Sequence, residues 1–511
     1  MSKTKTGKKG SRKVSRKDRV AEVANTFEWL ITAFILAFVF RSFIMEAFRI
    51  PTGSMADTLM GANFRLRCQQ CGYKYDHGFV PQNYRLPPDT VPRGNVHPPR
   101  TRCPSCGYYQ LTNSAMPISY GDRILVLKCI YQFSEPKQWD VVVFKNPLEP
   151  AVNYIKRLVG RPGETVEIID GDIYIDGQIS RKPSKVQNEL WMPIYDNDYQ
   201  PVRPREGSFN GHIWQQPFRN AAGSKWIIEK DNPTVFCLYC SENEINSLIY
   251  DTSIGNDFRA SYAYNDVREY NYMPYCSDLM VRLYVNPAES SGRVGMALGK
   301  YQTDYRAWVD FAGNMVIEVM KDGKTVELAR RSIEPAIVNR PSLVKLANVD
   351  HQLIFQFGSE KLVYDLGRLP GDAGPRETNI QPVVEIFGSG KLKLSHVAIF
   401  RDIHYTSAKF ANSISSGRAV EGNSFTLKED EFFMLGDNSP NSEDCRWWSR
   451  KGVGNNRSFY REGIVPRDYL VGKALCVYWP NGFKLSGKSG FALIPNIGQM
   501  RLIYGGSNKN Q

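Results

Sequence analysis

The sequence predicts a mainly β protein with one N-terminal apolar helix, a discontinuous β-domain and two inserted segments. Short apolar runs with strand-like alternation recur from residue 120 onward, separated by Gly, Pro and Asp turns. A single long apolar run lies near the N-terminus, and two pairs of cysteines interrupt the pattern between residues 65 and 112. At 511 residues, with 42% hydrophobic and 12% aromatic residues, the chain can form several packed domains.

The first element is an apolar segment that follows a basic tail. Lys and Arg dominate residues 1–20, so much of the net charge of +13 is local. The apolar run at 29–40 extends to residue 48, which is long enough to cross a bilayer if Arg41 and Glu46 reach the interface. The layout also fits a cleavable secretory signal, but no small-x-small site follows the run. We therefore expect a retained anchor with a cytoplasmic N-terminus.

Composition disfavours several other classes of protein. No basic face or nucleic-acid-binding signature occurs outside the tail, so we expect no nucleic-acid partner. The six histidines are scattered without an HExxH motif, which disfavours a histidine-based hydrolytic metal site. The ten cysteines are too few for a disulfide scaffold of this length.

The strand-like runs form two groups. The first extends from residue 120 to 175 and resumes at residue 430. The second, from 279 to 401, has evenly spaced strands with Gly and Asp turns, typical of an antiparallel β-sandwich. A pattern that stops and resumes is most simply one discontinuous domain with the sandwich inserted.

Three segments contain candidate chemistry. Ser54 ends an Ile-Pro-Thr-Gly-Ser stretch just after the apolar run, although such a serine is also common in ordinary turns. On the strand at 153–160, alternation places Tyr154 and Lys156 on one face and Ile155 and Arg157 on the other. A buried lysine is costly unless its amine is neutral, and a neutral amine beside a serine hydroxyl is a general base. The alternative without a catalytic role is that Lys156 lies on the protein surface.

The third segment is a polar loop, Gly-Asp-Asn-Ser-Pro-Asn-Ser-Glu-Asp-Cys-Arg, at 436–446. Together with Tyr-Gly-Asp-Arg-Ile-Leu-Val at 120–126 and Trp-Asp-Val-Val-Val-Phe at 139–144, these segments resemble the sequence boxes of type I signal peptidases. Their order and the preceding apolar run agree with that family. The resemblance covers residues 27–64, 116–185 and 426–482.

The resemblance implies a serine–lysine peptidase with Ser54 as nucleophile and Lys156 as general base. It implies that the Ser54 N–H and the Thr52 hydroxyl form the oxyanion hole. It implies that Ser442 is the hydrogen-bond partner of the amine and that Asp444 and Arg446 form a supporting charged pair. The side chains that it implies around the −1 and −3 pockets are Phe48, Ile50, Tyr154 and Ile155. The sequence departs from the family pattern at Asp57, where proline is usual, and at Cys445.

A second cluster comprises Cys68, Cys71, Cys103 and Cys106. Both CxxC pairs precede Gly-Tyr and resemble the knuckles of a zinc ribbon, so we expect one structural zinc ion and no catalytic cofactor. The spacer is longer than usual, and two disulfides are the alternative outside the cytoplasm. Cys237 and Cys240 fit a core position or a local bridge.

The expected domain map has six parts. They are a basic tail (1–25), a transmembrane anchor (26–48), a discontinuous peptidase domain (49–66, 113–186 and 423–485), a zinc-ribbon-like insertion (67–112), a β-sandwich insertion (187–422) and a C-terminal tail (486–511). The segments at 308–319 and 395–406 are similar to jelly-roll sandwiches of the concanavalin and laminin-G type, which leaves open a glycan ligand, a protein ligand or a structural role. Because insertions leave and re-enter at exposed turns, we expect the sandwich to be separable from the catalytic mechanism.

The resemblance thus implies a signal peptidase of the inner membrane, with its catalytic domain on the outer face and preproteins and lipid as partners. One rival is a membrane-anchored binding protein with a relic peptidase core. A second is the related self-cleaving repressor type of serine–lysine protease, which the apolar anchor and the lack of a DNA-binding segment disfavour.

Overall fold

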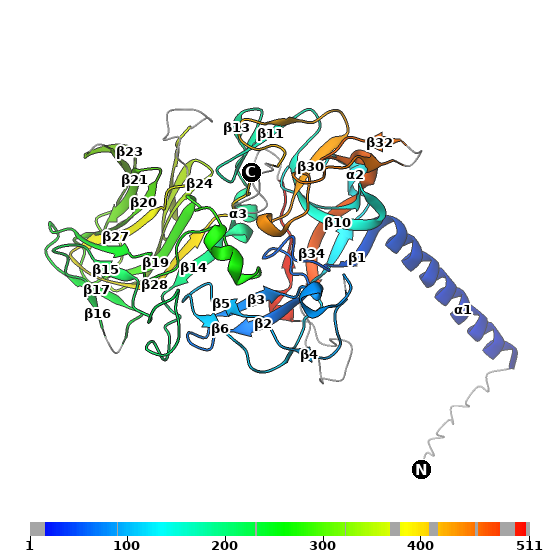
Figure 1. Cartoon of the computed structure of the whole chain (residues 1–511), viewed down its shortest axis with the longest axis horizontal. Helices are drawn as coiled ribbons and strands as arrows, with labels where there is room; N and C mark the ends of the chain where they lie inside the picture. Colours follow the sequence, from blue (N-terminus) through cyan, green and yellow to red (C-terminus); the bar gives the residue numbers. More distant parts are fainter. Residues whose placement is uncertain are drawn as a thin grey trace, which may run out of the picture.

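The computed structural model describes residues 16–88, 90–229, 232–321, 323–367, 379–407, 417–454, 458–480 and 496–506. Figure 1 shows a β-sandwich at one side, a second β-domain at the other, a small cysteine-containing module near β2 and β5, and one helix that extends outward. The predicted mainly β class, the split domain and the inserted sandwich are confirmed.

The outward helix is α1 (Arg16–Val39), continued by a π-helical turn at Phe40–Ile44. Glu22–Ile44 is apolar enough to cross a membrane, with a mean hydropathy of 1.8 and no part of it buried in the protein. The apolar helix ends earlier than the expected residue 48, because Met45–Arg49 forms strand β1 and pairs with β8.

The domain next to this helix is built on an eight-stranded sheet. Its strands, in order across the sheet, are β1 (Met45–Arg49), β8 (Arg123–Leu127), β34 (Leu470–Trp479), β9 (Val141–Asn146), β10 (Glu149–Gly160), β30 (Glu431–Leu435) and β33 (Val465–Pro466), with β35 (Arg501–Leu502) beside β34. Segments from both ends of the chain therefore interleave in one sheet. Two apolar clusters cover its faces, and the second half of β10 is buried on both sides.

Smaller elements complete this domain. They are the sheet β13 (Gln178–Ile179), β12 (Asp172–Ile175), β11 (Thr165–Ile169), β29 (Phe425–Thr426), the ribbon β31 (Gly452–Val453) and β32 (Phe459–Tyr460), helices α2 (Ile130–Phe133) and α3 (Ser184–Leu190), and 3₁₀ turns at Ser439–Asn441, Arg467–Tyr469 and Ile497–Gln499. Val186 and Leu190 of α3 pack in the same core as Ile403 and Tyr405. The chain therefore leaves this domain after α3 and returns at residue 402.

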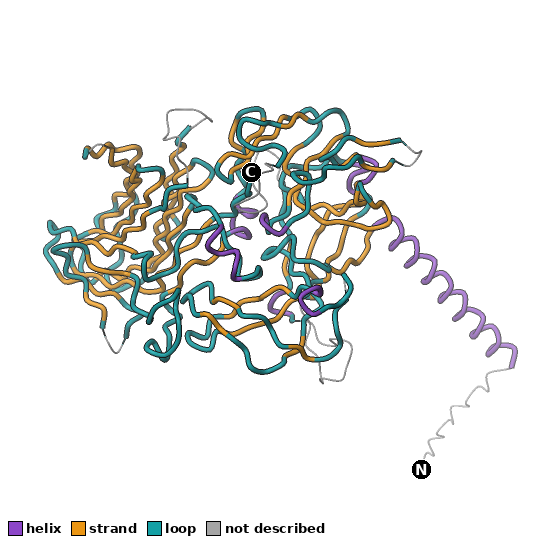
Figure 2. Tube along the Cα trace, viewed as in Figure 1, coloured by secondary structure: helices purple, strands orange, loops and turns teal. Residues whose placement is uncertain are grey.

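The sandwich between these points has two antiparallel sheets, coloured as strands in Figure 2. One comprises β16 (Ile227–Ile228), β17 (Phe236–Tyr239), β28 (Lys391–Arg401), β19 (Leu279–Pro287), β24 (Ser342–Val349), β25 (Gln352–Phe357) and β26 (Glu360–Asp365), with β14 (Met192–Asp196) also on β28. The other comprises β15 (Phe218–Asn220), β18 (Asn246–Tyr250), β27 (Val383–Ser389), β20 (Arg293–Lys300), β21 (Thr303–Asp310), β22 (Asn314–Lys321) and β23 (Lys324–Ser332). Alternating side chains such as Tyr305, Ala307 and Val309 fill the core between them.

The cysteine-containing module consists of three two-stranded ribbons. They are β2 (Asn63–Arg67) with β3 (Lys74–Gly78), β4 (Asn95–Val96) with β7 (Met116–Pro117), and β5 (Thr101–Arg102) with β6 (Tyr109–Gln110); a 3₁₀ turn at Pro81–Tyr84 follows β3. Phe209 and Trp214, which lie between β14 and β15, pack into the apolar core of this module. The second insertion therefore contacts the first.

A buried charged cluster joins the sandwich to the split domain. Four carboxyl groups lie within 4.8 Å of one another, at Asp172, Asp278, Asp350 and Asp402. Lys182 contacts Asp350 and lies 2.9 Å from Asp402, and Lys300 contacts Asp278. Because two ammonium groups already partner these carboxylates, the cluster is an ion-pair network between the two domains rather than an unpaired acidic site.

Candidate active site

Ser54 and Lys156 meet where the loop after β1 crosses β10. The Ser54 Oγ and the Lys156 Nζ are 2.7 Å apart. Met55 and Leu59 anchor the loop in the apolar core of the sheet, and the Ile50 N–H donates to the Asp122 carbonyl at 2.8 Å. The two groups, 102 residues apart in the chain, are thus brought within hydrogen-bond distance.

Lys156 is 4% exposed, and its amine also donates to the Ile155 carbonyl at 3.1 Å. Desolvation lowers the pKa of this amine from 10.5 to about 8, while the negative charges of Asp444 and Asp437 oppose the shift. A substantial fraction of the amine is therefore neutral at mildly alkaline pH. A neutral amine against a hydroxyl can accept the proton of that hydroxyl.

Asp444 and Arg446 form a fully buried ion pair at 2.8 Å. The Asp444 carboxylate also binds the backbone of the loop, since its Oδ2 accepts a hydrogen bond from the Gly436 N–H at 3.0 Å. The Arg446 guanidinium donates to the Ser439 Oγ at 2.6 Å and to the Thr406 carbonyl at 2.7 Å. The pair therefore closes the polar loop 436–446 into a compact turn beneath Lys156.

Ser442 does not occupy the role that the resemblance implies. Its Oγ is buried and, among the described residues, has no hydrogen-bond partner. The hydroxyl lies against Gly436, where an added Cβ would approach it to 2.2 Å, and the same position is 2.5 Å from the Ser54 carbonyl. The amine of Lys156 is instead held by Ser54 and Ile155.

Arg157, the next residue on β10, is a site residue that the alternation argument missed. Its guanidinium makes two bonds to Asp437, at 2.8 and 2.6 Å, and both side chains are 0% exposed. Alternation placed Arg157 on the face opposite to Lys156, but this end of β10 is buried on both faces. Sequence offered one usable signal, since a fully charged side chain inside an apolar strand needs a buried counter-charge.

The residues implied for substrate recognition surround the same loop. Phe48 and Ile155 pack, partly buried, on the cluster that contains Ile50. Tyr154 packs on the neighbouring cluster, with its ring 6.4 Å from that of Phe144. The Thr52 side chain is exposed at the start of the loop.

The sandwich insertion also reaches this site, through a stretch that the sequence left unassigned. Tyr262, Tyr264 and Asn265 are buried against the serine loop and the loop at 437–438. These contacts differ from the expectation that the insertion stands apart from the catalytic residues. The Tyr-rich segment has no strand period, so sequence patterning gave no signal of its packing.

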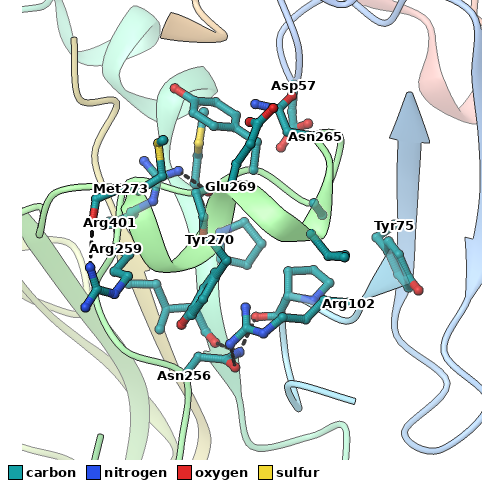
Figure 3. A pocket seen from close by; sticks show the side chains of 18 of the residues that line it. Asp57, Tyr75, Arg102, Asn256, Arg259, Asn265, Glu269, Tyr270, Met273 and Arg401 are labelled. Atoms are coloured by element: carbon teal, nitrogen blue, oxygen red, sulfur yellow. Dashed lines mark hydrogen bonds between the residues drawn. The ribbon is translucent and has the colours of Figure 1, made fainter. Parts of the chain in front are cut away.

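Asp57 faces the insertion as well. It lines a cavity of about 260 Å³ together with Asn265, Glu269 and Arg401 (Figure 3). Burial raises the pKa of Asp57 to about 6, and the Arg401 guanidinium opposes that shift. Asp57, which stands where proline is usual in the family, therefore has a charged neighbour, Arg401, in the inserted domain.

The four cysteines of the small module converge on one point. Their sulfur atoms all lie within 4.8 Å of one another, with Cys68–Cys106 and Cys71–Cys103 separations of 3.7 and 3.6 Å. Four thiolates about 2.3 Å from a tetrahedral ion would be spaced at about this distance, whereas a disulfide requires about 2.05 Å. The donor set therefore fits a structural zinc ion.

Comparison with known proteins gives two kinds of match. A family model described as "Signal peptidase, peptidase S26" matches residues 105–209 and 400–479, which include Lys156 and the loop 436–446 but not Ser54. The chain is 32% identical over 157 residues to signal peptidase I of Rickettsia canadensis (strain McKiel), and equally to that of Rickettsia akari (strain Hartford). These alignments cover 30% of this chain and 44% of each relative, so the chain spans less than half the length of these curated relatives.

Among solved structures, sheep galectin-11 is 12% identical, with a TM-score of 0.19, over 25% of this chain and 93% of the galectin. The carbohydrate-binding module CBM66 from Bacillus subtilis is also 12% identical, with a TM-score of 0.20, over 37% of this chain and 93% of that module.

Proposed function

We propose that this chain, which belongs to the S26 signal peptidase family, is an active membrane-bound serine endopeptidase that removes signal peptides from preproteins. One observation carries the proposal: the Ser54 hydroxyl lies 2.7 Å from the Lys156 amine. Burial lowers the pKa of that amine to about 8. A relic core would have no need to keep a desolvated amine against a serine.

The proposed reaction passes through an acyl-enzyme. The Ser54 oxygen attacks the scissile carbonyl as Lys156 takes the hydroxyl proton, and the Ser54 N–H and Thr52 hydroxyl stabilise the oxyanion. The ammonium then gives its proton to the leaving amine as the carbon–nitrogen bond breaks. Water hydrolyses the ester with Lys156 again as base, and Ser54 regains its proton.

Specificity is assigned to the apolar side chains beside the serine loop. Phe48, Ile50 and Ile155 pack in one apolar cluster, and the ring centroid of Tyr154 lies 5.3 Å from the Lys156 amine. We propose that they form shallow pockets for small residues at −1 and −3 of the preprotein.

The apolar helix is assigned as a retained, single membrane anchor of the inner membrane. Its free apolar surface supports a lipid environment, and the basic tail before it favours a cytoplasmic N-terminus. The catalytic sheet would then stand on the outer face, where preproteins emerge.

The cysteine module is proposed to bind one zinc ion structurally. Cys68, Cys71, Cys103 and Cys106 would hold it, and the ion would hold the two knuckles together. The ion is assigned no part in catalysis.

The decisive experiment is cleavage of a preprotein by the purified, detergent-solubilised enzyme. Ser54→Ala, Lys156→Ala and Lys156→Arg should each lower the rate by at least about a thousandfold, since the dyad acts as a unit and a guanidinium keeps its proton. Ser134→Ala and Lys145→Ala, on neighbouring surfaces, should cleave as wild type. Cleavage by Ser54→Ala at more than about a hundredth of the wild-type rate would contradict the proposal.

A second candidate function, binding of a glycan by the sandwich, is favoured by the surface around Trp308. Its indole donates to Glu318 at 3.2 Å, and the Arg293 guanidinium lies 4.7 Å from its ring. Charged hydrogen-bonding groups close to a partly exposed aromatic ring suit a polyhydroxylated ligand. Binding of wild type to an oligosaccharide panel, abolished in Trp308→Ala, would support it; a panel without a binder would remove it.

A further inference from the structure

Asn438 fixes the backbone around the proposed nucleophile. Its backbone N–H donates to the Ser54 carbonyl at 3.0 Å, and its side-chain amide donates to the Gly53 carbonyl at 3.0 Å. One residue therefore holds the carbonyls on both sides of the Ser54 N–H, through its backbone on one side and its side chain on the other. That N–H is a proposed oxyanion donor, so its direction depends on these two bonds.

The orientation of the Asn438 amide is determined by the inserted domain. Asn265 Nδ2 donates to Asn438 Oδ1 at 2.9 Å, and Asn438 Nδ2 donates to Asn265 Oδ1 at 2.7 Å. With the bond to Gly53, both amide hydrogens of Asn438 are used. Without Asn265 the amide could turn and present its oxygen to the Gly53 carbonyl, which would repel it.

Tyr264 contacts the serine loop directly. A Cβ on Gly53 would lie 2.0 Å from the Tyr264 ring, so the ring packs against the residue that precedes Ser54. Its hydroxyl donates to the Ala62 carbonyl at 2.8 Å, at the other end of the loop. The Tyr264 carbonyl accepts from the Gly78 N–H at 2.8 Å, which ties it to the cysteine module.

Tyr262 contacts the opposite side of the site. Its hydroxyl donates to the Asp437 carbonyl at 2.8 Å. Asp437 in turn pairs with Arg157, the neighbour of Lys156 on β10. The Tyr262 ring lies 5.0 Å below the Arg401 guanidinium, the group that faces Asp57 of the serine loop.

We propose that the segment 262–265 of the inserted domain is a positioning element of the active site, which aligns the serine loop with β10 through Tyr262, Tyr264 and Asn265. This inference rests on the proposed peptidase function and adds to it, because it gives the insertion a part in catalysis without contact to substrate. Misplacement of a nucleophile by even 1 Å slows a reaction severely, and no other described side chain satisfies the Asn438 amide.

The test measures kcat and KM for a short peptide substrate, so that contacts remote from the cleavage site play no part. Asn265→Ala should lower kcat about tenfold or more with KM within about twofold, and Tyr264→Phe should lower it by a smaller factor. Asn246→Ala and Tyr250→Phe are matched controls. Both residues are buried in the same insertion and their side chains donate within it, Asn246 to the Glu244 carbonyl and the Tyr250 hydroxyl to the Asn256 carbonyl, rather than to the serine loop. Both controls should keep kcat.

A double-mutant cycle separates positioning from general destabilisation. Asn265→Ala combined with Asn438→Ala should lower kcat no further than the worse single variant, because the two amides act as one unit. Asn246→Ala combined with Asn438→Ala should be additive. Additive behaviour of Asn265 with Asn438, or wild-type kcat in both Asn265→Ala and Tyr264→Phe, would overturn the inference.

The outcome is distinguishable from failure of the proposed function. If the wild type does not cleave, or cleaves without Ser54, the peptidase assignment fails and this inference fails with it. If cleavage by the wild type depends on Ser54 and the 262–265 variants keep full kcat as the two controls do, the peptidase assignment stands and the positioning role is wrong. Should Asn265→Ala melt below the assay temperature, Tyr264→Phe, which removes one hydroxyl, decides the question.

Discussion

Lys156 and Arg157 are neighbours on one strand with opposite responses to burial. An ammonium loses charge when desolvated, because its pKa can fall into the working range, whereas a guanidinium stays charged. Lys156 accordingly lies against a hydroxyl and a carbonyl, and Arg157 lies against the Asp437 carboxylate. The two adjacent basic residues therefore differ in role: Lys156 is the proposed base, and Arg157 is the counter-ion of Asp437.

We predict that the cleavage rate rises with pH through about 8. The pKa of Lys156 is lowered to about 8, mainly by desolvation, so the amine is protonated and inactive below that value and neutral above it. The measurement is kcat/KM of the solubilised enzyme between pH 6 and 10, with thermal melting recorded at each pH. A maximum near pH 5 would point to a carboxylate base.

At this scale the sequence identified Ser54 and Lys156 as partners, because residue types with that chemistry stood in recognisable motifs. It did not reveal that Arg157 is buried, since strict alternation assumes that one strand face meets solvent. It also implied a bond from Ser442 to the amine, whereas that hydroxyl lies beside Gly436. Rotamers within a packed loop have no signature in residue order.

Among the elements, β10 depends most on a single buried interaction. We predict that Arg157→Met lowers the free energy of unfolding by about 3–5 kcal/mol, because it leaves Asp437 charged and unpaired in the core. Thermal melting in detergent should show the loss. Adding Asp437→Asn to that variant should restore part of the stability, and Arg161→Met, at an exposed pair with Glu164, should have little effect. Equal melting of Arg157→Met and wild type would contradict the buried-pair account.

The cysteine module gives a prediction about metal content. Purified protein should contain about one zinc ion per chain, and the double variant Cys68→Ser/Cys71→Ser should contain none, because four thiolates are needed to close the site. Elemental analysis is the measurement. Cys237→Ser, which changes a cysteine of the sandwich rather than of the module, is the matched control, and this variant should retain the ion. Two disulfides by mass spectrometry, with no metal, would rule zinc out.

For the molecule as a whole, we predict that replacing residues 192–401 by a short Gly-Ser linker lowers peptide cleavage at least about tenfold. The deletion removes Asn265, Tyr264 and Arg401 from the serine loop, although sequence alone favoured retained activity. A Gly-Ser pair added after the exposed Ser359 should leave activity unchanged. A folded deletion variant with wild-type kcat would show that the catalytic residues align without the insertion.

The whole-molecule arrangement was only partly predictable. Strand periods and turn residues were sufficient for the sandwich and for the split domain around it. The segment 262–265 was not assigned, because buried tyrosines and asparagines outside regular strands follow no period. Its contacts join residues about 200 positions apart, and a single sequence carries no signal of such pairings.

The short connection between helix and sheet also limits the distance between Ser54 and the end of the apolar helix. Ser54 follows the end of the apolar helix at Ile44 by ten residues, and β1 holds five of them in the sheet. At about 3.3 Å per extended residue, the nucleophile lies no more than about 35 Å beyond the helix end. With that helix in a bilayer, the proposed nucleophile would be restricted to a narrow range of heights above the membrane surface. A precursor would then be cut according to the height at which its own apolar segment holds the scissile bond, as well as by the side chains on either side of it.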